Sequence, residues 1–348
     1  MKLASRLSRI KPSATLAMTV KAKSLASQGI PIIDFGVGEP DFDTPDLIKE
    51  SGIEAIRSGF TKYTPPGGMD ALKAAILQKI YEEKNLSYEK NEVIVSCGAK
   101  HSLYNIAQAL FEKGDEVIIP APYWVSYPDQ IMMNEGTAVI VPTREENGFI
   151  LEAAELEKAI TSRTKAVILN TPSNPTGAAY SKRNLEAVAE IALKHKILVI
   201  FDEIYEKIVY DGYKHFNIVS LCPELKSLTL SVSGVSKAYS MTGWRIGYTV
   251  GPKEIIKAME MIQGQSTSNP TSISQKASIT ALESGDPFTE KMVEEFDRRR
   301  RNDFSNQTFT LWTFQNRGIT EFLNQFKPMT AFFTFVFIDG QCFFFSPC

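Results

Sequence analysis

Short apolar runs rich in β-branched residues alternate along this chain with amphipathic helical stretches. Such alternation predicts a mostly parallel sheet with helices on both faces. The run Ile-Leu-Val-Ile-Phe at 197–201 is apolar throughout, as expected of a strand buried on both faces. Strands are predicted at 92–96, 116–119, 137–142, 166–170, 197–202 and 228–232, and helices at 100–111, 152–160 and 182–195.

Composition excludes several classes of function. The chain has 348 residues, of which 43% are apolar and 22% charged, and a net charge of −2, so it lacks the basic excess of a nucleic-acid-binding protein. No apolar run has the length of a membrane span. Four cysteines without CxxC spacing and three histidines argue against a metal site and favour a reducing compartment, by default the cytoplasm. Residues 1–33 contain no acidic residue and are interpreted as a basic arm and first helix rather than a transit peptide.

Polar residues stand directly after the predicted strands, where parallel sheets bind ligands. Asp202 ends one strand, Asn174 follows another, and Lys237 lies in the small-residue loop after a third. A desolvated lysine is a nucleophile toward carbonyls, and a carboxylate such as Asp202 can hold a protonated pyridine nitrogen. Asn174 could bind the phenolic oxygen of the same ring.

Three further features complete a site of cofactor size. Gly98, Ala99 and Lys100 open a helix directly after a strand, where backbone N–H groups bind phosphate. Arg245 could add a bidentate contact, and Trp124 could stack on an aromatic ring. Each residue alone also has an ordinary structural interpretation, such as a surface lysine, a turn asparagine or a core tryptophan. Together they make the set that pyridoxal phosphate (PLP) requires.

The chain resembles the class I aminotransferase family of fold-type I PLP enzymes, and within it the bacterial-type aspartate aminotransferase and prephenate aminotransferase subgroup. The resemblance rests on ordered motifs between about residues 1 and 301. They include Gly-Val-Gly-Glu-Pro-Asp-Phe-Asp-Thr-Pro (36–45), Lys-Tyr-Thr-Pro-Pro-Gly-Gly (62–68), Ala-Pro-Tyr-Trp-Val-Ser-Tyr-Pro (121–128), Ser-Asn-Pro-Thr-Gly (173–177), Asp-Glu-Ile-Tyr-Glu (202–206) and Ser-Lys-Ala-Tyr-Ser-Met-Thr-Gly-Trp-Arg-Ile-Gly (236–247).

The resemblance implies a role for each matching residue. Lys237 would be the catalytic residue, binding PLP covalently and later carrying the proton at the substrate Cα. Tyr63 would reach the phosphate from a partner subunit, which implies a homodimer. The implied cofactor-binding set is Tyr63, Gly98, Ala99, Lys100, Trp124, Asn174, Asp202, Tyr205, Ser236, Lys237 and Arg245. The implied substrate-binding set is Ser13, Thr15, Gly38, Lys100, Trp124 and Asn174, with Lys100 and Thr15 on the distal carboxylate of a dicarboxylic substrate.

The resemblance also implies an organisation of the chain. Residues 1–40 would form an N-terminal arm and the first part of a small domain, and residues 41–285 the large PLP-binding domain. Residues 286–348 would be an aberrant or truncated remnant of the small domain, because 302–348 are rich in Phe and leave the family's pattern. The family's late arginine, which binds the substrate α-carboxylate, has no match there, since Arg317 stands in a different context.

The expected activity is transfer of an amino group between aspartate or glutamate and 2-oxo acids. Prephenate is the alternative acceptor, and the sequence does not separate the two. A PLP-binding protein with impaired catalysis is a second alternative, because the late arginine is missing. A PLP enzyme with other chemistry, such as a lyase, is a third. The expected partners are small amino acids and 2-oxo acids, without nucleic acid, membrane or metal.

Overall fold

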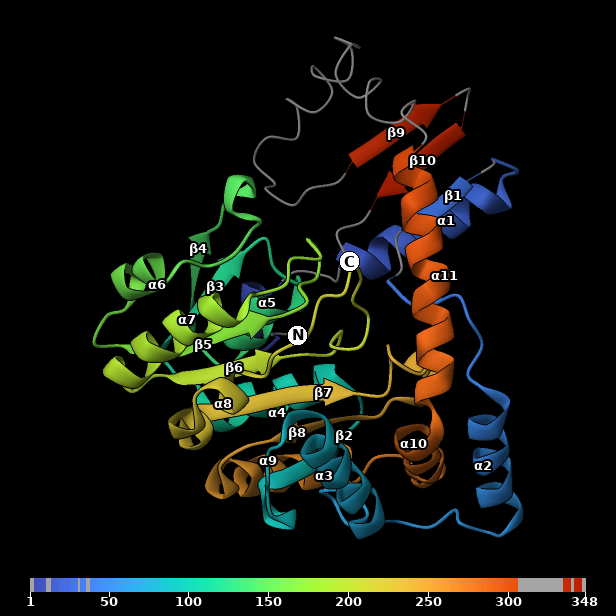
Figure 1. The fold of residues 1–348 in the computed structure, drawn as a ribbon, viewed down its shortest axis with the longest axis horizontal. Coiled ribbons are helices and arrows are strands. Elements are labelled where there is room, and N and C mark those ends of the chain that lie inside the picture. The colour runs from blue at the N-terminus through green and yellow to red at the C-terminus, as the bar shows by residue number, and fades with distance from the viewer. Residues whose placement is uncertain are drawn as a thin grey trace. The chain divides into compact units, whose positions relative to one another are not determined.

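The computed structural model describes residues 3–10, 14–30, 32–35, 38–305, 334–338 and 341–345 (Figure 1). The chain divides into two compact units. The first consists of Met1–Lys11 and Glu39–Thr289, and the second of Pro12–Gly38 and Glu290–Cys348.

A seven-stranded sheet forms the centre of the first unit, in the order β2-β8-β7-β6-β5-β3-β4. Neighbouring strands from β4 to β7 run parallel, whereas β8 is antiparallel to both β7 and β2. The prediction of a mostly parallel sheet is confirmed, and each of the six predicted strands is present. The strands are β2 (Val93–Ser96), β3 (Glu116–Ala121), β4 (Thr137–Pro142), β5 (Thr164–Asn170), β6 (Leu198–Asp202), β7 (Thr229–Gly234) and β8 (Gly247–Val250).

Helices cover both faces of this sheet, as predicted (Figure 1). Alternate strand residues point to opposite faces, so Val167 and Leu169 join one buried cluster while Ala166 and Ile168 join another. The first cluster is closed by α6 (Ala153–Ala159), α7 (Lys182–His195) and α8 (Ile218–Leu221). The second is closed by α4 (Ala99–Leu110), α5 (Ser126–Met133) and α9 (Lys253–Ser266).

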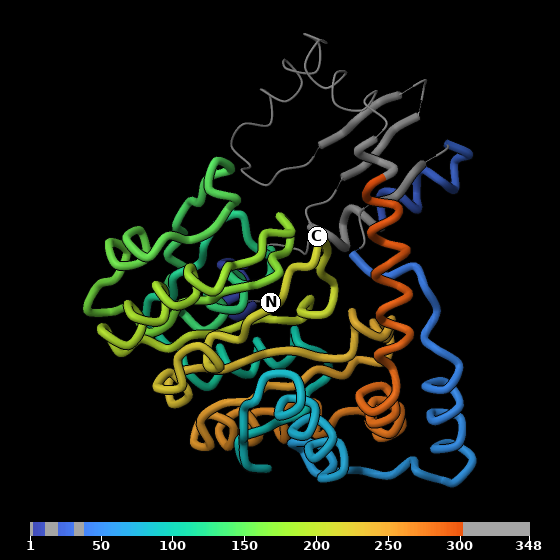
Figure 2. The backbone as a smooth tube through the Cα atoms, viewed as in Figure 1, coloured from blue at the N-terminus to red at the C-terminus, as the bar shows by residue number. Residues whose placement is uncertain are grey.

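A third apolar cluster packs against β2 and β8. It is formed by α2 (Asp46–Arg57), α3 (Asp70–Lys84) and α10 (Ser272–Ser284), and α2 contacts α10 although the two are far apart in the sequence (Figure 2). The buried amide of Gln263 ties α9 to this region by donating to the carbonyl of Val95 (2.7 Å) and accepting from Asn105 (3.0 Å). These contacts fix the end of β2 from which α4 begins.

The second unit contains α1 (Ala14–Ser27), β1 (Ile32–Phe35), β9 (Thr334–Ile338) and β10 (Gln341–Phe345). In it β10 pairs parallel with β1 and antiparallel with β9. Helix α11 (Asp286–Ser305) starts in the first unit and continues in the second. Most of the Phe-rich segment lies outside the described residues, so its interpretation as an aberrant remnant, like the predicted domain limits, stays a prediction.

Five short 3-10 helices complete the secondary structure of the described residues: η1 (Ser5–Arg9), η2 (Lys90–Glu92), η3 (Glu145–Asn147), η4 (Pro223–Leu228) and η5 (Thr242–Trp244). None of the helices in the described part of the chain is long and apolar enough to cross a membrane.

The packing of α7 on the sheet gives a stability prediction. Leu185 is 1% exposed, so Leu185→Ala leaves a cavity, and we expect the free energy of unfolding to fall by about 2–5 kcal/mol. Leu47, 44% exposed on α2, is the control, and Leu47→Ala should change it by less than about 0.5 kcal/mol. Urea unfolding of both variants measures the difference. Equal effects would contradict the burial of Leu185 between α7 and the sheet.

Candidate active site

Several of the predicted site residues lie at the carboxyl ends of neighbouring strands, along one edge of the sheet. Asn170 ends β5 and is paired in register with Asp202, which ends β6. Gly234 ends β7 and faces Gly247 of β8, which in turn faces Ser96 at the end of β2. Because the loops that carry Asn174, Lys237 and Gly98 leave from these ends, the topology itself brings the candidates together.

Asp202 is the most buried of the candidate side chains, with 3% of its surface exposed. One carboxylate oxygen accepts a hydrogen bond from the hydroxyl of Tyr127 (2.6 Å), and the other from the backbone N–H of Ile204 (3.2 Å). Burial raises the pKa of Asp202 to about 6. Such a carboxyl group is poised to take up a positively charged partner, which would bring its pKa down again.

Tyr205, Asn174 and Lys237 lie next to one another. The amide of Asn174 donates to the hydroxyl of Tyr205 at 3.5 Å, and Nζ of Lys237 lies 5.6 Å from the centre of the Tyr205 ring. Oδ1 of Asn174 is buried and has no hydrogen-bond partner among the described residues. A buried polar atom without a partner is costly, so this amide is suited to binding a ligand.

Gly98, Gly247 and Arg245 form a cradle at the start of α4. Gly98 has a φ of 88°, and a side chain there would meet the Arg245 guanidinium at 2.2 Å. A side chain at Gly247 would meet the backbone nitrogen of Ala99 at 2.2 Å. The guanidinium donates to the carbonyls of Thr242 (2.7 Å) and Cys97 (3.3 Å). It therefore stands beside the first N–H groups of α4, which have no partner within the helix and favour an anion.

Lys100 and Trp124 form a cation–π pair in this region, with Nζ 4.8 Å from the ring centre. Burial and the nearby Arg245 lower the pKa of Lys100. Trp124 also packs edge-on against Tyr127, with ring centres 5.3 Å apart. This contact links Trp124, which is predicted to stack on the cofactor ring, to Tyr127, which donates a hydrogen bond to Asp202.

The other predicted site residues differ in their position in the fold and in their exposure. Ser236 is buried, with 7% of its surface exposed, in the loop that carries Lys237. Tyr63 is 90% exposed on the loop between α2 and α3. Thr15 lies in α1 and Gly38 follows β1, both in the second unit, while Ser13 lies outside the described residues. The roles of Thr15, Gly38 and Ser13 toward a substrate therefore stay predictions.

Sequence analysis missed two residues that shape the site. Tyr127 holds Asp202, and Asn170 bridges two loops, donating to the carbonyl of Asp202 (3.0 Å) and accepting from the N–H of Asn174 (2.6 Å). The spacing of Tyr127 three residues after Trp124, on the first turn of a helix, was the one available signal.

The side chains fit PLP, the cofactor that the resemblance implies. An anion site at a helix start, a buried carboxylate, an unpartnered amide oxygen beside a tyrosine hydroxyl and a half-buried lysine stand along one sheet edge. These groups match the phosphate, ring nitrogen, ring oxygen and carbonyl of that molecule.

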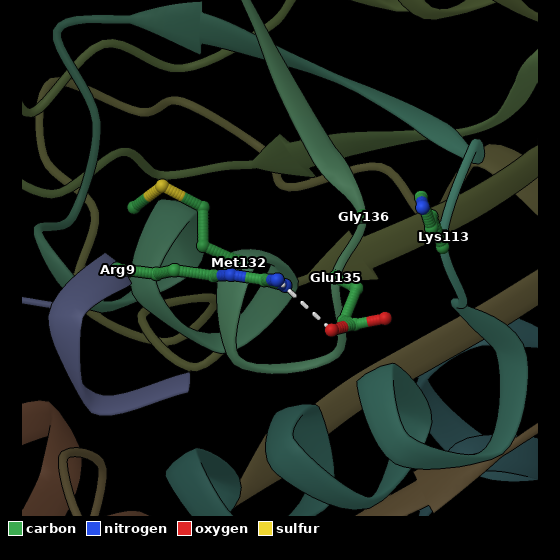
Figure 3. A pocket seen from close by; sticks show the side chains of 5 residues that line it. All are labelled: Arg9, Lys113, Met132, Glu135 and Gly136. Carbon is green, nitrogen blue, oxygen red and sulfur yellow. Dashed lines mark ion pairs between the residues drawn. The ribbon is translucent and has the colours of Figure 1, made fainter. Parts of the chain in front are cut away.

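A surface pocket of about 450 Å³ lies elsewhere, lined by Arg9, Lys113, Met132, Glu135 and Gly136 (Figure 3). Lys113 and Gly136 precede the starts of β3 and β4, so this pocket is at the opposite edge of the sheet from the candidate site. Its ion pair, Arg9 to Glu135 at 2.9 Å, is half exposed and contributes little energy.

Comparisons with known proteins agree with this geometry. The sequence model of the family described as "Aminotransferase class I and II" matches residues 30–307. An aspartate aminotransferase from Geobacillus stearothermophilus is 52% identical over 299 residues, which cover 86% of this chain and 76% of the relative. A probable aspartate/prephenate aminotransferase from Rickettsia felis is 48% identical over 338 residues, covering 97% of this chain and 80% of the relative. The solved structure of the Thermus thermophilus aspartate aminotransferase with maleate is similar at a TM-score of 0.84, with 44% identity, covering 86% of this chain and 78% of that one.

The raised pKa of Asp202 predicts a pH-dependent stability. Between about pH 4 and 6, the folded chain without cofactor keeps a proton on Asp202, whereas the unfolded chain releases it. The free energy of unfolding is therefore higher at low pH and falls as the pH rises through this range. Asp202→Asn removes that titration. As the pH rises from 4 to 7, we expect the free energy of unfolding of this variant to increase by about 2–3 kcal/mol relative to that of the wild type. Urea unfolding at several pH values measures it, and a difference that does not change with pH would contradict the burial argument.

The cradle gives a second prediction. Gly98→Ala puts a side chain at a positive φ and against Arg245, so we expect PLP to bind at least about tenfold more weakly. The matched control is Gly243→Ala, in the same region, because a side chain at Gly243 meets no atom within 4 Å. Fluorescence titration with PLP measures both affinities. Equal affinities would show that Gly98 does not line the phosphate site.

Proposed function

This chain belongs to the class I and II aminotransferase family, and from that premise we propose that it transfers the amino group between L-aspartate or L-glutamate and 2-oxo acids, using PLP held at the sheet edge. The observation that carries the proposal is the grouping of Lys237, Asp202, Asn174, Tyr205 and Arg245 on neighbouring strand ends. Relatives named aspartate aminotransferase support the choice of aspartate.

Each group has a chemical task in this proposal. When bound, PLP supplies a carbonyl that accepts the amino group and a ring that stores electrons. Lys237 would hold that carbonyl covalently and, once displaced by substrate, take the proton from the substrate Cα at its Nζ. Asp202 would keep the ring nitrogen protonated, because the buried carboxylate needs a cationic partner.

The other side chains would orient the cofactor. Asn174 and Tyr205 would hydrogen-bond the ring oxygen, and Trp124 would stack on the ring. The start of α4, with Ala99, Lys100, Ser236 and Arg245, would bind the phosphate. A lysine already placed beside the reacting carbon converts a bimolecular proton transfer into an intramolecular one.

A homodimer in the cytoplasm is the proposed working form. Tyr63 is 90% exposed, and Met261 of α9 is 67% exposed. The loop that carries Tyr63 is held to α9 by a hydrogen bond from the N–H of Gly67 to the carboxylate of Glu260 (3.2 Å). An interface would bury these two large exposed side chains. The free thiols of Cys97 and Cys222 support a reducing compartment. Thr15 and Gly38 are proposed to contact the substrate.

Prephenate is the second candidate acceptor, favoured by the Rickettsia relative that is named for both substrates. Comparing initial rates with oxaloacetate and with prephenate, at saturating amino donor, separates the two. A faster rate with prephenate would move this alternative to first place.

We expect the purified protein to bind PLP with a visible absorption band that disappears when L-aspartate is added, as the amino group moves to the cofactor. Lys237→Ala should lack the band of covalently held PLP and lose activity by a factor of about 10³ or more, because it removes both the attachment point and the base. Lys253→Ala, at a 65% exposed side chain, is the control and should behave like the wild type.

If the absorption band of the wild-type protein does not change when aspartate or glutamate is added, the alternative of a PLP-binding protein with impaired catalysis is favoured. If the wild-type protein shows no absorption band of bound PLP, the proposed PLP-dependent amino transfer is refuted. Release of ammonia instead of formation of a new amino acid would indicate a lyase.

A further inference from the structure

A buried ion network lies directly behind the turn that carries Tyr205. Lys84, the last residue of α3, places its Nζ 2.6 Å from a carboxylate oxygen of Glu203 and 2.5 Å from one of Glu206. The three side chains are 9%, 3% and 11% exposed. Charges removed from water to this extent persist only when they are paired in good geometry.

The backbone between the two carboxylates forms a tight turn. The N–H of Glu206 donates to the carbonyl of Glu203 at 2.9 Å, so residues 203–206 form a β-turn with Tyr205 as its third residue. Asp202 stands immediately before this turn. One ammonium group therefore contacts both the first and the last side chain of the turn on which Tyr205 is carried.

Further hydrogen bonds connect the network to the rest of the site. His215 contacts the second oxygen of Glu203 (2.8 Å), and Asn217 donates to both of its oxygens (3.1 Å). Ser233, near the end of β7, donates to Glu206 at 3.0 Å. The loop with Lys237 begins just after Ser233, so the same network reaches the strands before both Tyr205 and Lys237.

The single ammonium group of Lys84 faces both carboxylates of the network. Burial alone would raise the pKa of Glu203, but Lys84 and His215 hold it well below its usual range. Burial raises the pKa of Glu206 in spite of Lys84. Burial opposes the charged form of Lys84, but the carboxylates of Glu203 and Glu206 outweigh it and raise the pKa of Lys84. Glu203, Glu206 and His215 are near enough to one another to bind a metal ion, yet the ammonium of Lys84 already supplies the cation to both carboxylates.

We propose that Lys84 is a positioning residue for the cofactor: by binding Glu203 and Glu206 together it fixes the turn that carries Tyr205 and directly follows Asp202, and so orients both side chains toward the ring of PLP. The inference rests on the proposed function of these two residues. Lys84 acts through the two glutamates with which its ammonium group pairs.

The test compares Lys84→Met with the wild type and with Lys84→Arg. Met has a similar length but no charge, so the turn loses its anchor, and we expect PLP to bind about 10- to 100-fold more weakly, the range known for partners that orient ligand-binding groups in metal sites. The visible band of bound PLP should also shift, because the hydroxyl of Tyr205 acts on the ring oxygen. Lys84→Arg keeps the charge and should recover most of the affinity and the wild-type band.

Lys165→Met is the control for loss of an ion pair at a more exposed lysine, 37% against 9% for Lys84. Lys165 pairs with Asp115 at 3.1 Å near the starts of β5 and β3, at the opposite edge of the sheet. Its loss removes an ion pair without touching the turn, so the affinity for PLP and the band should stay as in the wild type. Equal effects of both Met variants would overturn the proposal, because they would reflect general loss of stability.

Glu206→Met covers the case in which Lys84→Met does not fold. It leaves Lys84 and Glu203 as a balanced buried pair while freeing the far end of the turn, so a shifted band and weaker PLP binding are again expected. A Glu206→Met protein that is folded by near-UV circular dichroism and binds PLP like the wild type would overturn the proposal. A wild-type protein that fails to bind PLP would instead refute the proposed function, which keeps the two failures distinct.

Discussion

The buried carboxylate of Asp202 is the constraint on which the site depends. It sits at the end of a central strand, 3% exposed, with one oxygen held by Tyr127 and the other by the turn that follows. Burial without a cation is unfavourable, and its raised pKa of about 6 expresses that cost. We propose that a ligand with a protonated ring nitrogen relieves this cost, and that contacts to its phosphate and ring oxygen fix its orientation.

Two layers of polar groups support this arrangement. The inner layer of Asp202, Asn174, Tyr205 and Lys237 faces the proposed cofactor. The outer layer of Lys84, Glu203 and Glu206 holds the backbone on which part of the inner layer is built. A buried ion pair is weak evidence for stability, and we propose that this one instead selects a single geometry for the turn.

Much of the fold could be predicted because its signals are local. Buried strands are apolar runs with loop residues at their ends, and the helix 182–195 was found with its limits, since Ser181 caps it and Leu185 and Val188 repeat on its buried face. Strand β8 was missed: it has four residues, and it is antiparallel because it returns directly from β7. The residues after the strands were found as site candidates, but Tyr127 and Lys84 were not, because they meet Asp202 and Glu203 from 75 and 119 positions away. Only tertiary packing creates such pairs.

The central claim is that this sheet edge holds PLP through Lys237. Reducing the PLP-loaded wild-type protein with borohydride and mapping the modified peptide by mass spectrometry tests it most directly. We expect one phosphopyridoxyl group per chain, on Lys237. A group found on surface lysines at random, or none after reduction, would contradict the account.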